Sequence, residues 1–163
     1  MVKYSLLVDV NLCHGCQACE VACKQENDIA KGPRWRRVIQ VGPKEVGGQL
    51  KMSFVPVYCL HCTKPVCMNV CPTMAITRRA DGIVLINADL CTGCKACIEA
   101  CPFGAPQLNP ETNIVEMCTM CVHRVDEGHE PACVLACPTG AIRFGDLNEL
   151  IELKRAKYAE SFL

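Results

Sequence analysis

The chain has 163 residues, which is enough for one domain or two very small ones, and it has only one Trp, three Tyr and four Phe with which to build a core. Its 17 basic and 17 acidic side chains cancel, which excludes a bulk electrostatic attraction to nucleic acid. Sixteen cysteines instead indicate a chain that is stabilised by metals or by disulfides.

The N-terminal stretch MVKYSLLVDVNLC shows neither the basic segment nor the apolar run of an export signal. No apolar run in the chain approaches the roughly 18 residues of a membrane span. The cysteines also repeat a metal-type spacing, which a disulfide framework does not require. We therefore expect a cytoplasmic chain without a membrane span, in which the cysteines are reduced and bind metal.

The cysteines form four groups of four, and every group begins CxxC and ends CxxxC while the middle gap varies. In chain order they are Cys13, Cys16, Cys19 and Cys23; Cys59, Cys62, Cys67 and Cys71; Cys91, Cys94, Cys97 and Cys101; and Cys118, Cys121, Cys133 and Cys137. The third group, CTGCKACIEACP, is the bacterial ferredoxin run. Tetrahedral zinc has no need of three ligands crowded on one loop. Four such groups therefore predict four [4Fe–4S] clusters.

Short strands and helices are expected around these groups. β-like stretches enter the first and third groups at residues 4–13 and 82–91, and each CxxxC end fits the first turn of a helix. Residues 24–57 insert two strand-like stretches joined by a turn. Residues 75–86, with an Asp-Gly turn, and residues 105–118, with an Asn-Pro turn, each read as a hairpin.

A terminal helix is predicted after Asp146, which would be its N-cap. Its apolar positions are expected to pack on the body or on a neighbouring subunit; they are Leu147, Leu150, Ile151 and Leu153.

Strand, cluster loop, helix and hairpin follow one another in the order of a two-cluster ferredoxin, and the order occurs twice. The expected fold class is α+β, with two pseudo-symmetric bacterial 2[4Fe–4S] ferredoxin-like domains. Residues 58–116, with the second and third groups, would close as one domain. Residues 1–57 plus 117–163 would form the other, discontinuous domain.

In two-cluster ferredoxins the fourth cysteine of a run ligates the other cluster, so crossed ligand sets are expected. The four sets would be Cys13, Cys16, Cys19 and Cys137; Cys118, Cys121, Cys133 and Cys23; Cys59, Cys62, Cys67 and Cys101; and Cys91, Cys94, Cys97 and Cys71. The nested order of the groups makes these pairings the compact solution, while spacing alone leaves other pairings open.

Lys24 follows Cys23 where the other three groups have Pro, so the exit from the first group should differ. Lys24 is either a surface residue or a charge near a cluster, where it would raise the potential. Three histidines, His14, His61 and His123, lie within or beside cluster loops. Because a cysteine stands at every ligand position, we expect these histidines to lie near the clusters or at the surface.

Residues 24–58 carry a net charge of +4. This segment either steers the docking of a partner or forms a solvated face. Its Trp35 is either a buried structural residue or an anchor for a partner.

Enzyme motifs are missing from the sequence. There is no GxGxxG dinucleotide fingerprint, no GxxxxGK[ST] phosphate loop and no CxxxCxxC trio of radical-generating enzymes. If all sixteen cysteines are ligands, none remains as a nucleophile. The sequence thus predicts a non-catalytic conductor of electrons whose partner performs the catalysis.

The four groups in this order, with CPFGAPQ, the CTMC…HRVDEG stretch, PACVLACPTGAI and FGDL, closely resemble the four-cluster iron–sulfur subunits of molybdenum and tungsten oxidoreductases. Relatives in this family serve dimethyl sulfoxide reductase, polysulfide reductase and formate dehydrogenase. The resemblance implies an electron-transfer subunit that connects a molybdenum/tungsten-pterin catalytic subunit with a second redox partner. In size and architecture the chain is also similar to the small subunit of tungsten-dependent aldehyde oxidoreductases, where a flavin/NAD subunit would be that partner.

Two other functions stay open. The chain could be a free-standing polyferredoxin that works as a shuttle or self-associates into a wire, or the iron–sulfur subunit of a formate dehydrogenase or respiratory reductase. A redox or metal sensor is disfavoured, because sensing needs one labile site. Since the core is thin, folding is expected to depend on metal.

Overall fold

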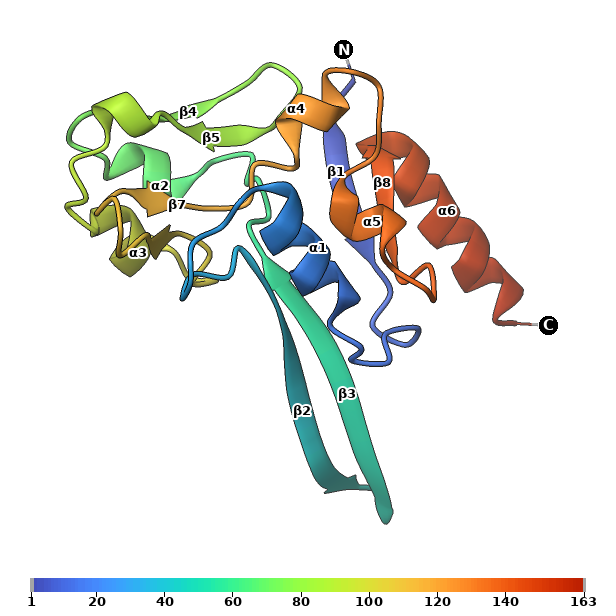
Figure 1. Ribbon diagram of the computed structural model, residues 1–163. Helices are drawn as coiled ribbons and strands as arrows, with labels where there is room; N and C mark the ends of the chain where they lie inside the picture. The colour runs from blue at the N-terminus through green and yellow to red at the C-terminus, as the bar shows by residue number, and fades with distance from the viewer. Residues whose placement is uncertain (1, 163) are drawn as a thin grey trace.

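The computed structural model describes residues 2–162, and in that part of the chain four two-stranded antiparallel sheets and several short helices surround the cysteine loops (Figure 1). The strands are β1 (Tyr4–Val8), β2 (Arg36–Val46), β3 (Gln49–Tyr58), β4 (Ile76–Arg78), β5 (Val84–Ile86), β6 (Gln107–Leu108), β7 (Val115–Glu116) and β8 (Ile142–Asp146). The helices are α1 (Ala18–Glu26), α2 (Val66–Asn69), the 3-10 helix η1 (Ala88–Leu90), α3 (Ala96–Ala100), α4 (Val122–Val125), α5 (Ala132–Leu135) and α6 (Leu147–Glu160). This mixture confirms the predicted α+β class.

The two predicted hairpins are present. β4 pairs with β5 and β6 pairs with β7, both antiparallel. In the first hairpin Gly82 has φ +95°, a conformation that the Asp-Gly turn supplies without strain. β1 pairs with β8, so the two ends of the chain meet in one sheet. These pairings do not test the predicted two-domain division, which stays a prediction.

Helices at the CxxxC ends differ in length according to the residue after the fourth cysteine. α2, α3 and α5 are four or five residues long and end before Cys71, Cys101 and Cys137. Each of these cysteines is followed by Pro, which disfavours the helical conformation in the residue before it. α1 has no Pro and runs on through Cys23 to Glu26. The expected difference at the first group is therefore confirmed.

Lys24 stabilises the loop after α1 by two hydrogen bonds. Its Nζ donates to the carbonyl oxygens of Ala30, at 2.8 Å, and Pro33, at 3.0 Å. These two hydrogen bonds give the residue a structural role that neither sequence-based interpretation included.

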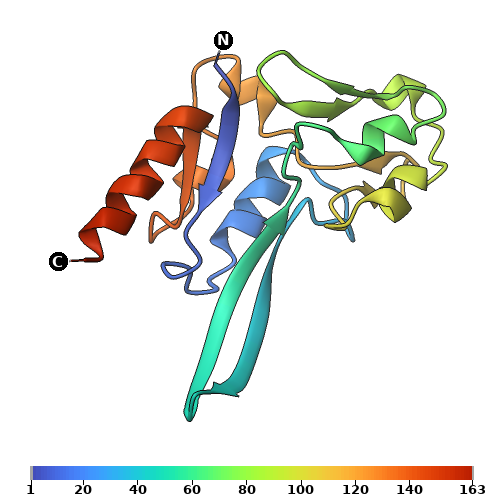
Figure 2. The ribbon, with the colours of Figure 1, turned by 180° about the vertical axis from the view of Figure 1, so that it is seen from behind.

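The insertion forms an antiparallel arm of β2 and β3, which extends away from the rest of the molecule (Figures 1 and 2). At its base, Arg36 and Tyr58 are buried. Farther out, Val41, Leu50 and Met52 are each more than half exposed. The arm therefore contributes to the core only through its first few residue pairs.

α6 begins as predicted, because the Asp146 carboxylate accepts a hydrogen bond from the N–H of Asn148 at 2.9 Å. The prediction about its apolar face was only partly right. Leu150 is buried, whereas Leu147, Ile151 and Leu153 are 40–48% exposed. The helix lies along one side of the β1–β8 sheet (Figure 2), so a single row of its residues faces the protein.

Candidate iron–sulfur sites

The four predicted cysteine sets are named here sites A to D. Site A is Cys13, Cys16, Cys19 and Cys137; site B is Cys23, Cys118, Cys121 and Cys133; site C is Cys59, Cys62, Cys67 and Cys101; site D is Cys71, Cys91, Cys94 and Cys97.

The structure gathers the cysteines of sites C and D around two separate hollows. All four cysteines of site C line one of them, together with Pro65, Ala105 and Met117. All four cysteines of site D line the other, together with Ala75 and Ile76. In both sites the fourth cysteine of one group thus joins the first three of another. The two linings agree with the crossed sets that the ferredoxin run predicts, and the ligand sets themselves stay a prediction.

The cysteines of site B meet through α1. Burial and then the neighbouring thiols of Cys118, Cys133 and Cys121 raise the pKa of Cys23. The Asn27 Nδ2 amide lies 4.0 Å from the Cys23 sulfur and 3.7 Å from that of Cys121. Asn27 was not singled out in the sequence, because only its position one helical turn after Cys23 brings it here.

In site A, Cys19 and Cys137 pack together in one apolar cluster. Burial raises the pKa of Cys19, and the charges of Cys133, Glu20 and Cys13 add to this effect, whereas Arg36 opposes it. Cys13 therefore lies close to Cys19. Cys16 is exposed on the loop between them.

Shared apolar clusters connect the four sites. One cluster contains Cys97 of site D, Cys59 of site C and Cys118 of site B. A second cluster contains Cys133 of site B with Cys19 and Cys137 of site A. Within the first cluster, the charge of Cys67 in site C acts on Cys97, and that of Cys118 in site B acts on Cys59. Neighbouring sites therefore follow one another in the order D, C, B, A.

Burial determines the protonation of most inner thiols. It raises the pKa of Cys97 and Cys118 to about 11 and that of Cys59 to about 12. A thiolate at these positions therefore needs a positive partner close by. Iron ions are such partners, which fits the donor set of four thiolates per site.

Two threonines stabilise the charged form of the fourth cysteine of their groups. The hydroxyl of Thr73 lies 3.6 Å from the Cys71 sulfur, and that of Thr139 lies 3.6 Å from the Cys137 sulfur. Partial burial raises the pKa of both thiols, but these hydroxyls together with backbone N–H groups reverse the effect and lower it overall. The repeated CPT in the second and fourth groups was the sequence signal for this contact.

Several buried polar groups without protein partners belong to residues beside the cysteine sets. Among the described residues, the buried side-chain atoms that lack a hydrogen-bond partner are Arg36 Nη1 and Nη2, Trp35 Nε1, His61 Nε2 and Arg78 Nε. Arg36 acts on the thiols of Cys133 and Cys118, and Trp35 packs against the apolar cluster that contains Cys59 and Cys118. Unpaired donors beside thiol sets fit anionic clusters, whose sulfur atoms accept hydrogen bonds.

The histidines take non-ligand positions. His14 is exposed, and His123 Nε2 lies 2.9 Å from Glu26 Oε1. His61 is buried, and its Nδ1 accepts a hydrogen bond from the N–H of Val84 at 3.0 Å. Burial lowers the pKa of His61 to about 4, so the ring is neutral at neutral pH.

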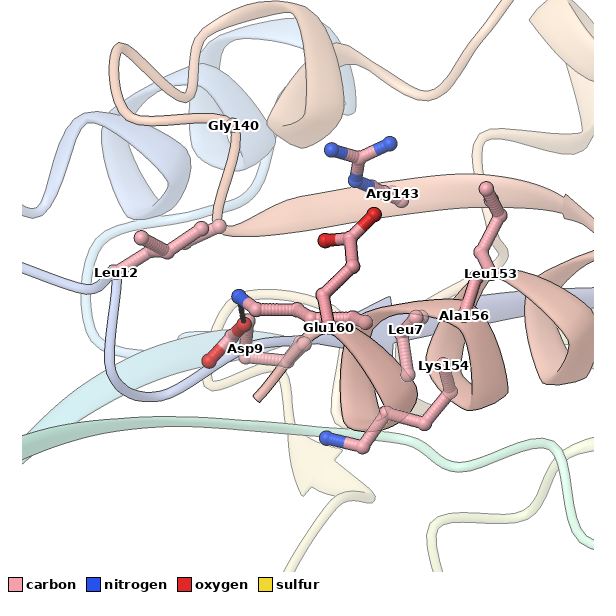
Figure 3. Close-up of a pocket in the computed structure, with 12 residues that line it drawn as sticks. Leu7, Asp9, Leu12, Gly140, Arg143, Leu153, Lys154, Ala156 and Glu160 are labelled. Atoms are coloured by element: carbon pink, nitrogen blue, oxygen red, sulfur yellow. Dashed lines mark hydrogen bonds and ion pairs between the residues drawn. The ribbon is translucent and has the colours of Figure 1, made fainter. Parts of the chain in front are cut away.

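A separate hollow of about 330 Å³ lies between α6 and the β1–β8 sheet (Figure 3). No cysteine lines it, whereas side chains of both charges do, and Glu160 extends toward Arg143 in Figure 3. Lys157 donates to the Asp9 carboxylate at its edge, and this hydrogen bond is the main reason why the pKa of Asp9 is lowered. The hollow is therefore distinct from the thiol sites.

No helix within residues 2–162 is both long and apolar enough to cross a membrane.

Comparison with known proteins identifies the family. Residues 50–147 match a family model described as a 4Fe–4S dicluster domain, and residues 12–75 match a second model with the same description. Two dicluster matches correspond to four clusters, and the number of cysteines, sixteen, fits four ligands for each.

Several curated relatives match almost the whole chain. The dimethyl sulfoxide reductase iron–sulfur subunit of Halobacterium salinarum is 40% identical over 91% of this chain and 68% of its own length. A polysulfide reductase chain of Wolinella succinogenes is 43% identical over 90% of this chain and 78% of its own length. The nitrate-inducible formate dehydrogenase iron–sulfur subunit of Escherichia coli is 41% identical, and this chain spans 58% of that relative's length.

These matches confirm the resemblance derived from the cysteine motifs. The relatives are named as iron–sulfur subunits or chains of oxidoreductase complexes, which makes the present chain an electron-transfer subunit without catalytic chemistry of its own. The chain thus belongs to the 4Fe–4S dicluster family of iron–sulfur subunits and carries four [4Fe–4S] clusters.

Proposed function

We propose that this chain relays electrons between a molybdenum- or tungsten-pterin catalytic subunit and a second redox partner, with sites A to D as the four ligand sets. The observation that carries the proposal is the succession of neighbouring thiol sets: the cysteines of D and C line two hollows, and shared apolar clusters connect D and C with B, and B with A. When bound, each [4Fe–4S] cluster takes up and gives up one electron. A row of such sites across a small protein suits transfer from one face to another.

The chain's own residues hold the sites and adjust their electrostatics. Backbone N–H groups of His61, Met120 and Val115 donate to the sulfur atoms of Cys59, Cys118 and Cys91 at 3.4–3.5 Å. Apolar neighbours such as Met117 and Ile76 shield the inner thiols from water. Hydrogen bonds to sulfur and exclusion of solvent are the main means by which a protein sets cluster potentials.

The specific assignment that we propose is the small subunit of a tungsten-dependent aldehyde oxidoreductase, in which a flavin/NAD subunit is the second partner. Its support is the sequence resemblance in size and architecture. This proposal places the chain in the reducing cytoplasm, where sixteen thiols in metal spacing stay reduced.

A second candidate is the iron–sulfur subunit of a formate dehydrogenase or respiratory reductase. It is favoured by the names of the relatives at 40–43% identity. The two candidates differ in the substrate that feeds electrons into the row of sites, and the experiment below separates them by that substrate.

The experiment is anaerobic purification of the chain, tagged at its C-terminus, from its native cells. Co-purifying subunits are identified by mass spectrometry, tungsten and molybdenum by elemental analysis and flavin by fluorescence. We expect a pterin-containing subunit in equal amount and dye reduction with an aldehyde. Activity with formate instead would support the second candidate. A chain that purifies alone with its full iron content would contradict both and indicate a free polyferredoxin.

A further inference from the structure

Arg36 is a charged side chain in the interior of the protein. It begins β2, is 1% exposed and pairs across the arm with Tyr58. The guanidinium carbon lies 4.0 Å from the centre of the Tyr58 ring. Neither Nη1 nor Nη2 meets the geometry of a hydrogen bond among the described residues. Burial raises the pKa of the Cys133 thiol, while the charge of Arg36 and a side-chain contact with Arg36 act to lower it, so the guanidinium lies against a member of site B. Since arginine stays protonated and a buried charge is costly without an opposite charge, an anion must face it.

No free carboxylate fills that role. Glu20, the buried acid on the neighbouring α1, already accepts hydrogen bonds from the N–H of Val38 and from Arg34. The groups that act on Arg36 are Tyr58 and three thiols. Although burial is the largest effect and lowers the pKa of Arg36, the charges of Cys133, Cys118, Tyr58 and Cys19 raise it overall.

Most of these thiols belong to one site. Cys118 and Cys133 are members of site B, and Arg36 also acts on Cys23, its third member. Cys19, a member of site A, is the exception. By contrast, the charges that act on Cys59, Cys67 and Cys97, in sites C and D, come from other cysteines. The positive charge of Arg36 therefore acts mainly on site B, and to a smaller extent on site A, whereas the thiols of sites C and D are affected mainly by one another.

We propose that Arg36 is the internal counter-charge of site B and raises its reduction potential. The inference rests on the ligand sets proposed above. A fixed positive charge stabilises the reduced site more than the oxidised one, because reduction adds one electron and so one negative charge. A higher reduction potential at site B favours the transfer of an electron from site C to site B. Arg36 takes part in no bond formation or cleavage. It acts on site B only through its charge.

The test is a potentiometric titration, followed by EPR, of anaerobically purified Arg36→Gln, Arg36→Lys and Arg37→Gln chains. Arg37 is the matched control, because it is exposed on the same strand, one residue farther along. The signal of site B is identified beforehand as the one that Cys121→Ser removes or alters. Iron and sulfide contents are measured for every variant.

In Arg36→Gln we expect the site B equilibrium to shift at least tenfold toward the oxidised form, about 59 mV for one electron. Site A should shift less, sites C and D should stay unchanged, and Arg36→Lys should recover most of the effect. Arg37→Gln should match the parent chain.

If Arg36→Gln instead loses about a quarter of its iron, with only the site B signal missing and Arg36→Lys complete, the counter-charge is needed for assembly of site B. The potential of site B in Arg36→Lys then decides: a value near that of the parent chain supports the proposal, and a value that corresponds to at least a tenfold shift in the equilibrium overturns it. Unchanged potentials, an equal shift at all four sites, or loss of iron in both Arg36 variants would overturn it. These readouts need no partner subunit, so they are independent of whether the proposed relay function is correct.

Discussion

Arg79 and Asp126 form a two-pronged ion pair that joins the β4–β5 hairpin to the segment after α4. Arg79 Nη1 lies 2.9 Å from Asp126 Oδ2, and Nη2 lies 2.6 Å from Oδ1. Asp81 in the hairpin turn also contacts the guanidinium, at 2.8 Å. The pair thus links the loops that carry the second and third cysteine groups to those of the fourth.

We expect Arg79→Met to lower the resistance of the clusters to urea, measured by loss of their visible absorbance. The effect should be small, because the pair is at the surface. Asp126→Asn should have a similar effect, and the double variant should be no worse than either single one. Additive effects in the double variant would show that the two side chains act separately.

The same pair has a defined pH dependence. The hydrogen bond from Arg79 lowers the pKa of Asp126 below its usual 3.8. The stability that the pair contributes is therefore fully present above that value and is lost only as the pH falls through the lower, folded pKa. The difference between parent and Arg79→Met should stay constant from neutral pH down to about pH 5. A difference that disappears within this range would contradict the assignment.

The threonine contacts predict matched changes at the two outer sites. Thr73→Val should lower the reduction potential of site D, and Thr139→Val that of site A, because each removes a hydroxyl that stabilises a thiolate. A hydrogen bond of ~1 kcal/mol corresponds to some tens of millivolts for one electron. Valine keeps the shape, so iron content should not change. If the potential changes at the site whose threonine was not substituted, or at neither site, the threonine contacts do not determine the reduction potentials.

The sequence predicted the elements whose cause is local. CxxC spacing, the Asp-Gly turn at Gly82 and the Asp146 N-cap each act over a few residues, and the structure has all three. The crossed sets follow from the same local reasoning, because three cysteines on one loop leave one corner of a cluster to be filled from elsewhere, and they stay a prediction.

The charge environment of the sites was not predictable in this way. Arg36 and Arg37 are adjacent and chemically identical, yet one is buried beside thiols and the other is exposed. The register of β2 on β3, which pairs Arg36 with Tyr58, decides between them. The exposure of Ile151 and Leu153 on α6 likewise depends on how far the β1–β8 sheet extends under the helix. Helical periodicity predicts an apolar face but not how much of that face the sheet covers.

Gly93, in the loop of the third cysteine group, has no room for a side chain. It has φ +67°, and a Cβ there would lie 2.2 Å from the backbone oxygen of Asn113. We expect Gly93→Ala to push the loop away from the β6–β7 hairpin and to lose the site D cluster, about a quarter of the iron. Gly104→Ala is the control: its φ is +61°, but no atom lies within 4 Å of the added methyl. That variant should carry the backbone strain alone, ~1–2 kcal/mol, and keep its iron. Equal iron loss in both variants would assign the effect to backbone conformation instead of the clash.

Removal of iron should unfold the chain. Seven of the 22 buried apolar side chains among the described residues are cysteines: Cys19, Cys23, Cys59, Cys97, Cys118, Cys121 and Cys133. The helices that carry Cys67, Cys97 and Cys133 have four or five residues, far fewer than an isolated helix needs, and each sheet has two strands.

The ligand bonds must therefore supply much of the folding free energy. After anaerobic chelation under reducing conditions, circular dichroism should show little secondary structure, and iron with sulfide should restore it. A cooperative thermal transition of the iron-free chain, with the parent spectrum below it, would mean that the apolar core alone specifies the fold.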